Sequence, residues 1–159
     1  MSGTQVFDFA FQTRLVGGGQ TFELDCRCQS QAKRLAIVGE SGSGKSLTLQ
    51  LLAGLLRPQA GHVRIGGTCY GDIEKRLWLP PQQRQAGLLF QDYALFPHLT
   101  VAHNIAFGLR SRMRQWLLDL QQELDIPMLL ITHDPEDSEV LAQEVAHMEV
   151  GKLAYGVSG

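Results

Sequence analysis

The sequence has few cysteines, little excess charge and no long apolar run, and each of these absences excludes a class of protein. Its 159 residues include three cysteines, Cys26, Cys28 and Cys69, and an odd number argues against a disulfide framework. We expect free thiols in a reducing cytosol, with Cys26 and Cys28 on opposite faces of one strand. We expect no cysteine-built metal centre, because no second Cys/His pair stands at ligand spacing.

Charges of the two signs nearly balance, and the formal net charge is −2 at pH 7. A chain without a basic excess has no global field for nucleic acid or anionic lipid, so we expect no nucleic-acid partner. No apolar run reaches the roughly 18 residues of a membrane-spanning helix, and residues 1–5 do not begin a secretory signal. We therefore expect residues 1–159 to form one domain with a core of its own.

A phosphate-binding loop is the most informative stretch that is present. Residues 39–46 match the pattern G-x-x-x-x-G-K-[ST]. The apolar run 34–38 predicts a strand before the loop and the run 47–53 predicts a helix after it, which is the context that the motif needs. The glycines let backbone N–H groups turn toward phosphates, and the helix N-terminus adds partial positive charge. The predicted nucleotide-binding residues are Gly39, Glu40, Ser41, Gly42, Ser43, Gly44, Lys45, Ser46 and Leu47.

Two of these side chains have specific expected roles. Lys45 can reach the β- and γ-phosphates, and the Ser46 hydroxyl can ligate Mg²⁺. ATP and Mg²⁺ are therefore the expected ligands. The aromatic side chain that stacks on the base is left open between Phe11 and Phe22.

Strand and helix signals alternate around the loop, which predicts an α/β fold with a parallel sheet. Residues 6–11 and 21–26 predict an antiparallel hairpin that turns at 17–19. Residues 68–85 are expected to be irregular. The other expected elements are a turn with a short strand at 60–67, strands at 86–90 and 128–131, helices at 101–109, 112–124 and 135–143, and a closing hairpin of 145–150 with 152–157.

The helix at 112–124 has a clear amphipathic pattern. Arg112 and Arg114 are expected on its solvated side. Asp134 is expected to cap the next helix, with Pro135 in the first turn. The apolar stripe of the helix at 112–124 is expected at Met113, Trp116, Leu117, Leu120 and Leu124.

Four features stand in a telling order: the loop at 39–46, a strand ending in Phe90-Gln91-Asp92, the stretch 95–101 that begins Leu-Phe-Pro-His, and Leu-Ile-Thr-His-Asp at 130–134. Together they resemble the ATP-binding subunits of ABC transporters, and most of all bacterial importers of the molybdate and sulfate type. The resemblance covers nearly the whole chain. It implies a P-loop NTPase sheet with an antiparallel N-terminal β subdomain.

The resemblance also implies roles and partners. Gln91 would ligate Mg²⁺ or position the attacking water, and its amide offers both an acceptor and donors. His133 would contact the γ-phosphate from a strand end, where ligands of α/β sheets gather. Residues 92–105 would contact the coupling helix of a membrane permease. The family works as a homodimer on the cytoplasmic face of the plasma membrane. Without this context, Gln91 would be a surface strand end, His133 a satisfied side chain and 92–105 a plain loop.

Two elements of the family are missing between Leu109 and Met128. One is the LSGGQ-type signature with its helix, and the other is an apolar strand ending in Asp-Glu, which supports Mg²⁺ and polarises water. Several dozen residues are absent, with a junction near 110–111. Residues 16–20 imitate the signature and residues 116–119 imitate the strand, but we expect a hairpin turn and a helix there.

This departure bears on the fold. In the family, the missing strand lies between the strands that resemble 86–90 and 128–131. Those two strands must therefore pair with each other or leave buried backbone groups unpaired, and each unpaired group costs about 1–3 kcal/mol. We predict a marginal or rearranged fold, or a shortened version of a longer chain.

The leading function is the nucleotide-binding subunit of an ABC importer that binds Mg·ATP and hydrolyses it poorly or not at all. One alternative is a non-catalytic ATP-binding module. Another is a small P-loop phosphotransferase in which Arg110, Arg112 and Arg114 grip phosphates. A DNA-associated ABC ATPase fits poorly with an isoelectric point of about 6.2.

Overall fold

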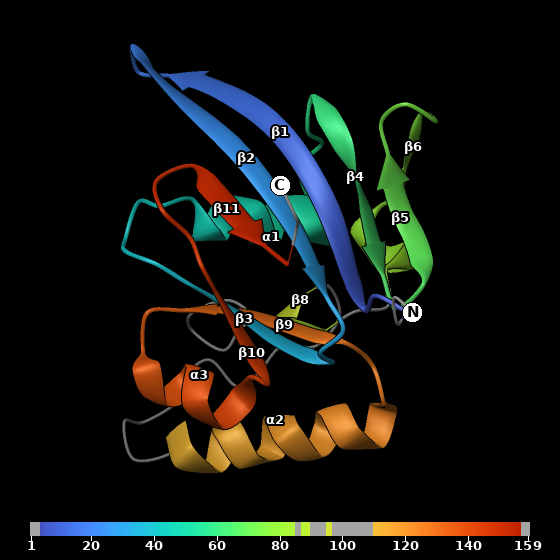
Figure 1. Cartoon of the computed structure of the whole chain (residues 1–159), viewed down its shortest axis with the longest axis vertical. Helices are drawn as coiled ribbons and strands as arrows, with labels where there is room; N and C mark the ends of the chain where they lie inside the picture. Colours follow the sequence, from blue (N-terminus) through green and yellow to red (C-terminus); the bar gives the residue numbers. More distant parts are fainter. Residues whose placement is uncertain (1–3, 85–86, 90–94, 97–109, 157–159) are drawn as a thin grey trace.

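The computed structural model describes residues 4–84, 87–89, 95–96 and 110–156, which form two sheets and three α-helices (Figure 1). The first sheet has the strand order β11-β2-β1-β4-β5-β6, and the second has the order β10-β3-β9-β7-β8. The predicted class, a P-loop sheet with an antiparallel β subdomain, is confirmed.

The first sheet is built on a long antiparallel hairpin. β1 (Phe7–Gly17) and β2 (Gln20–Ser30) pair along their whole length. Gly18 and Gly19 turn the chain at φ values of 58° and 77°, a region that favours glycine. Residues 16–20 are therefore the expected hairpin turn. The other strands of this sheet are β4 (Ala60–Ile65), β5 (Thr68–Asp72), β6 (Leu77–Trp78) and β11 (Lys152–Tyr155).

The expectation that residues 68–85 are irregular is wrong, because they hold β5, β6 and a 3₁₀ turn at Pro81–Gln83. Gly71 has no side chain, so the sequence of β5 lacks the regular alternation of apolar and polar residues that predicts a strand. A Cβ at this position would lie 2.2 Å from the Trp78 ring, so the ring occupies the space of a side chain. The indole of Trp78 therefore packs on β5 at the position where Gly71 has no side chain.

Cys26 and Cys28 lie on the same buried face of β2, so the expectation of opposite faces is wrong. Residues two apart on a strand share a face. Burial raises the pKa of both thiols to about 12. The two thiols are thus protonated and shielded near neutral pH, whereas Cys69 is partly exposed.

We expect one thiol per native chain to react with an aromatic disulfide reagent at pH 8. Cys69 is accessible, while Cys26 and Cys28 lack both exposure and thiolate character. Denaturant should release all three, as counted by absorbance of the liberated thiolate. Three fast thiols without denaturant would contradict the packing of β2.

The second sheet holds the strand that precedes the phosphate loop. β3 (Arg34–Val38) lies between β9 (Met128–Thr132) and β10 (Glu144–His147), and both pairings are parallel. α1 (Lys45–Ala53) follows the loop. The carboxyl ends of β3, β9 and β10 therefore meet at one edge, where ligands of α/β sheets bind.

Two apolar clusters hold these layers together. α1 contributes to the larger one, in which Leu49 and Leu52 pack between the inner faces of both sheets. α2 (Arg110–Leu124) and α3 (Pro135–Leu141) cover the other face of the second sheet through Leu117 and Leu141 (Figure 1). The phosphate loop is thus supported by a helix that is packed on two sheets.

Arg84 caps the C-terminal end of α1. Its guanidinium donates to the carbonyls of Leu52 and Leu79, both at 2.9 Å, and lies 4.6 Å from the Trp78 ring centroid. Burial lowers the pKa of Arg84 to about 10. The last carbonyls of a helix need such donors, so Arg84 ties α1 to the segment before β7.

β7 (Gly87–Leu89) pairs directly and in parallel with β9, with Leu88 opposite Leu129. β8 (Leu95–Phe96) pairs antiparallel with the other edge of β7. Of the two arrangements considered for a chain without the Asp-Glu strand, pairing of its neighbours or open backbone groups, the structure has the first. Direct pairing satisfies backbone groups that the missing strand would otherwise leave open.

The expected closing hairpin is wrong. β10 belongs to the second sheet, whereas β11 crosses to the first sheet and runs parallel to β2. An isolated bridge between Glu149 and Lys152 marks the turn between them. Gly151 adopts φ 72°, and a Cβ there would lie 2.2 Å from the Glu23 carbonyl oxygen. The turn therefore packs against the backbone of β2 instead of projecting as a hairpin.

The expected apolar stripe of α2 is partly wrong. Leu117 is buried, but Trp116 and Leu124 are 45% and 47% exposed. Arg114 and Gln121 are buried in their place. The helix is therefore rotated so that two polar side chains face the protein interior. Arg114 is buried because it contacts carboxylates beside the functional site, which are described below.

Candidate functional site

The phosphate loop joins the carboxyl end of β3 to the start of α1. Gly42 and Gly44 have φ values of 84° and 108°, which let the backbone fold back on itself. A Cβ on Gly39 would lie 2.5 Å from the Met148 carbonyl oxygen, so only glycine fits against the chain after β10. The loop is thus shaped by its own glycines and by a neighbouring strand end.

Lys45 lies within the loop, 4% exposed. Its ammonium donates to the carbonyl of Glu40 at 2.9 Å and to that of Gly39. Burial lowers the pKa of Lys45. A bound phosphate would offer this ammonium the counter-charge that the two carbonyls supply only in part.

Ser43 and Thr48 complete the cradle. Ser43 is buried, and its Oγ has no hydrogen-bond partner among the described residues. The Thr48 hydroxyl donates to the Gly44 carbonyl at 2.8 Å and ties the loop to the first turn of α1. A buried hydroxyl without a partner in a phosphate loop is suited to donate a hydrogen bond to an oxygen atom of a bound phosphate.

A pocket of about 370 Å³ opens beside the loop. It gathers six of the nine predicted nucleotide-binding residues, and its apolar wall comes from the hairpin of β1 and β2. The lining residues are Leu15, Phe22, Ser41, Gly42, Gly44, Lys45, Ser46 and Leu47. The volume and lining suit a ligand with one anionic and one flat apolar part.

The pocket favours one of the two aromatic candidates, Phe22. Phe22 lines it, whereas Phe11 is 1% exposed and stacks on Phe9 with ring centroids 5.5 Å apart. Leu15 was not predicted as a site residue. It reaches the loop only because the hairpin folds over it, and no local signal indicates that.

Ser46 is exposed on the first turn of α1 and lines the pocket beside the loop. Its hydroxyl suits Mg²⁺, which prefers oxygen ligands. Gln91, the other predicted magnesium ligand, lies outside the described residues. So do residues 92–105 apart from β8 (Leu95–Phe96), so both assignments stay predictions.

His133 follows β9 at the edge that carries the phosphate loop. The register pairs Val38 with Thr132, so Gly39 and His133 follow these paired residues at the same edge of the sheet. The imidazole is exposed and available to a ligand. Its role as a contact of the γ-phosphate remains a prediction.

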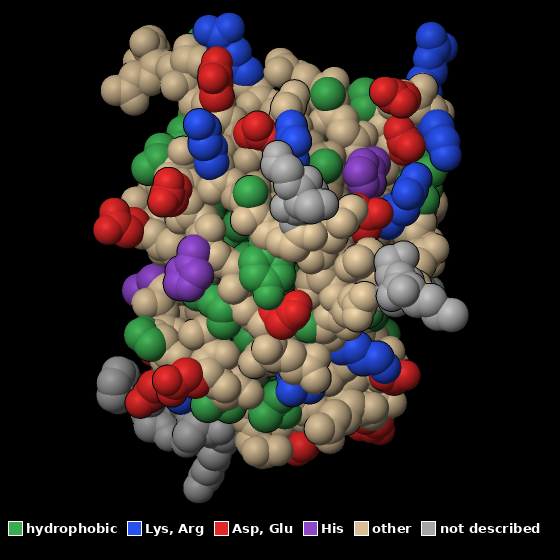
Figure 2. Space-filling view, in the orientation of Figure 1, with side chains coloured by type: hydrophobic (Ala, Val, Ile, Leu, Met, Phe, Trp, Pro, Cys, Tyr) green, Lys and Arg blue, Asp and Glu red, His purple; other side chains and the backbone are tan. Residues whose placement is uncertain are grey.

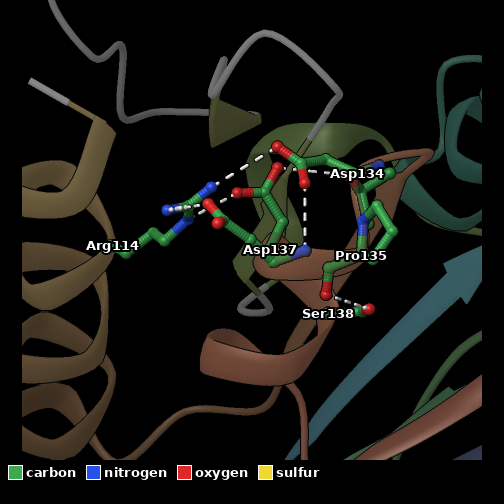
Figure 3. A network of polar contacts seen from close by, with 7 residues as sticks. Arg114, Asp134, Pro135, Asp137 and Ser138 are labelled. Atoms are coloured by element: carbon green, nitrogen blue, oxygen red, sulfur yellow. Dashed lines mark hydrogen bonds and ion pairs between the residues drawn. The ribbon is translucent and has the colours of Figure 1, made fainter. Parts of the chain in front are cut away.

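Asp134 is engaged in structure. Its side chain accepts from the Glu136 backbone N–H at 2.9 Å, which confirms it as the cap of α3. It also lies 3.4 Å from the Arg114 guanidinium (Figure 3). Among the described residues, no group of three or more His, Cys, Asp or Glu side chains could hold a metal ion.

The expectation that Arg114 lies on the solvated side of α2 is wrong. The guanidinium is 9% exposed and contacts three carboxylates. An arginine that is held in this way does not serve as a phosphate-gripping lid residue. The side chains of Arg110 and Arg112 lie outside the described residues.

Charges on the face shown in Figure 2 are mixed, with Lys and Arg side chains interspersed with Asp and Glu. In the part of the chain that the structure describes, no helix combines the length and apolarity needed to cross a bilayer.

Comparison with known proteins places these features in a family. Residues 25–157 match the family model described as ABC transporter. A solved dimeric bacterial ABC transporter cassette superposes with a TM-score of 0.61 at 15% identity, covering 91% of this chain and 96% of that one. At that identity the likeness concerns the fold alone.

Three curated relatives share parts of the sequence. The molybdenum import ATP-binding protein ModC of Mycobacterium tuberculosis is 48% identical over 83 residues, which are 52% of this chain and 22% of the relative. The trehalose/maltose import ATP-binding protein MalK of Thermococcus litoralis is 45% identical over 78 residues, 49% of this chain and 21% of the relative. The chain spans about a fifth of the length of these two relatives.

A third relative aligns over more of the chain. The molybdate/tungstate import ATP-binding protein WtpC of Archaeoglobus fulgidus is 31% identical over 183 residues, which cover 74% of each protein. That aligned stretch is longer than this whole chain of 159 residues. The relative therefore has residues within the stretch that have no counterpart here.

Proposed function

Because the chain belongs to the ABC transporter family, we propose that it is a shortened nucleotide-binding subunit of an ABC importer. It binds Mg·ATP and hydrolyses it poorly or not at all. The observation that carries this proposal is the phosphate loop, with Lys45 at its centre and a pocket of about 370 Å³ at its side.

The nucleotide has a natural orientation in this site. The phosphates lie over the loop, where Lys45 gives up its carbonyl contacts for phosphate oxygens and the start of α1 adds partial positive charge. The base lies toward Phe22 and Leu15. His133, across the edge from Gly39, contacts the terminal phosphate.

Ser46 and Gln91 would hold the magnesium ion. The exposed hydroxyl of Ser46 on the first turn of α1 supports the first assignment. When bound, the ion supplies charge neutralisation to the phosphates. This chain's own residues hold and orient the nucleotide.

Weak hydrolysis follows from the missing Asp-Glu strand. The direct pairing of β7 with β9 leaves no place between them for that strand. The relative from Archaeoglobus supports the same interpretation, because the stretch aligned with it exceeds this chain in length. Without the carboxylates, water lacks a general base at the terminal phosphate.

We expect single-turnover hydrolysis roughly 10²–10⁴-fold slower than in an intact family member, the range that a general base contributes. Protein in excess over ATP is mixed with Mg²⁺, and inorganic phosphate is measured over time. Lys45→Ala gives the background from contaminating ATPases. A Lys45-dependent rate near that of an intact relative would overturn the proposed impairment.

The partner and the solute belong to this proposal. The permease would contact residues 92–105 and hold the chain at the cytoplasmic face of the plasma membrane, in a homodimer of the family type. Two of the three relatives named above import molybdenum, or molybdate and tungstate, which supports molybdate as the solute. The third imports trehalose and maltose, so a role in import is better supported than any particular solute.

A further inference from the structure

Arg114 of α2 gathers three carboxylates that follow His133 in the sequence (Figure 3). Its Nε donates to Asp137 at 2.7 Å, and its two terminal nitrogens lie 3.4 Å from Asp134 and 3.3 Å from Glu136. We call Arg114, Asp134, Glu136 and Asp137 the Arg114 cluster. It joins one helix, α2, to the turn that carries the predicted phosphate contact.

The centre of the cluster is buried. The side chains of Arg114 and Asp137 are 9% and 4% exposed, whereas that of Glu136 is 75% exposed. A charge pair in such a place interacts more strongly than one at the surface, and its geometry is more closely defined. Among these three carboxylates, Asp137 is therefore the main partner of Arg114, and Glu136 adds little.

The cluster holds the chain on both sides of His133. The Thr132 hydroxyl donates to Asp137 at 3.1 Å and accepts from the Asp134 backbone N–H at 3.0 Å. Asp134 in turn caps α3. The residues before and after His133 are thus fixed through Arg114, while the imidazole itself is exposed to a ligand.

The sheet places this turn beside the phosphate loop. β9 and β3 pair in parallel through Thr132 and Val38, so His133 and Gly39 leave neighbouring strands at the same edge. Any tilt of the turn would move the imidazole relative to the terminal phosphate. A displacement of about 1 Å is enough to weaken an interaction of this kind strongly.

We propose that Arg114 is a positioning residue that acts through Asp137 and Asp134 to hold His133 toward the terminal phosphate of the nucleotide. The inference rests on the proposed function. It predicts that Arg114 contributes to recognition of ATP and not of ADP, because ADP lacks the phosphate that His133 contacts.

Affinities for ATP and ADP, measured by calorimetry with Mg²⁺, test this directly. Arg114→Gln should weaken ATP binding about tenfold, the worth of one charge-assisted hydrogen bond, and leave ADP binding unchanged. Arg114→Lys should recover part of the loss, since the charge is retained. The matched control is Lys33→Gln, which removes an exposed ion pair with Asp125 at the other end of α2 and should change neither affinity.

The imidazole of His133 gives a second readout that a merely structural role would not move. In protein with labelled histidines, ATP should shift the His133 ring signal in the wild type, and ADP should not. The signal is assigned with His133→Gln. In Arg114→Gln the shift by ATP should be lost.

A third variant covers the case in which Arg114→Gln does not fold. Replacing the buried pair together, as Arg114→Met with Asp137→Leu, removes both charges and keeps the apolar volume. This double variant should fold and should still bind ATP about tenfold more weakly, because Thr132 loses its partner. Wild-type preference for ATP over ADP in the double variant would overturn the inference.

The outcomes separate the two proposals. If the wild-type chain binds neither nucleotide, the proposed function fails and the inference fails with it. If the wild type binds both nucleotides but the ratio of the two affinities does not depend on Arg114, the inference alone fails.

Discussion

Replacing Lys45 with alanine should abolish the stabilisation of this chain by Mg·ATP. A ligand at 100 times its dissociation constant adds about 2.7 kcal/mol to the free energy of unfolding. For a domain of this size that corresponds to roughly 5–10 °C in Tm. Lys45 is buried in the loop and, among the described residues, donates to two backbone carbonyls, so its ammonium is the group that phosphates would engage.

The measurement is a thermal melt with and without Mg·ATP, and the quantity compared is the shift and not Tm itself. Lys45→Ala removes two hydrogen bonds of the free protein, so its Tm without ligand changes as well. The matched control is Lys75→Ala, at an exposed lysine away from the loop. An undiminished shift in Lys45→Ala would place ATP at another site.

Cysteines placed at Leu88 and Leu129 should form a disulfide readily, because these positions face each other across the β7–β9 pairing. Neighbouring strands are about 4.8 Å apart, which lies within the Cα separation of about 4.4–6.8 Å that disulfides use. The cross-link is formed by mild oxidation and identified by peptide mass spectrometry. It should appear in nearly every chain.

Leu88→Cys with Leu35→Cys is the matched control. Leu35 pairs with Leu129 on the far side of β9, so it stands two strands from Leu88, at roughly 10 Å. This pair should not cross-link. If neither pair cross-links, β7 does not lie beside β9, and the re-paired sheet is refuted.

Elements with strong local signals could be predicted from the sequence. β3 covers residues 34–38 as predicted, because a short β-branched run before a glycine loop has one interpretation. The cap of α3 follows from Asp134 next to Pro135. The glycine turn of the first hairpin is equally local. In each case the deciding interaction spans a few residues.

The failures depend on contacts between distant residues. The hairpin predicted for 145–157 has a good local pattern, but β2 and β3 offer each half a longer partner. The stripe of α2 fails because Asp137, on another helix, buries Arg114 in place of Trp116. Sequence periodicity measures apolarity and does not register a carboxylate elsewhere in the chain.

The site residues also divide into those that a local motif predicts and those that only tertiary packing brings to the pocket. The loop residues that line the pocket follow from one motif, whereas Leu15 joins them only through the folding of the hairpin. Phe22 and Phe11 lie on the same face of the hairpin, and only their positions along it set Phe22 beside the pocket and Phe11 in the core. Tertiary packing decides which of two similar side chains is available.

The pairing of β11 with β2 has a consequence for how the chain folds while it is being translated. Residues 25–28 of β2 pair with β1 along one edge, and their other edge is covered only when Lys152–Tyr155 have been made. At about 5–20 residues per second, that edge stays open for roughly 6–25 seconds of translation. An open strand edge is a template for pairing with another chain. Losses of this protein to aggregation should therefore fall on the nascent chain, before β11 emerges.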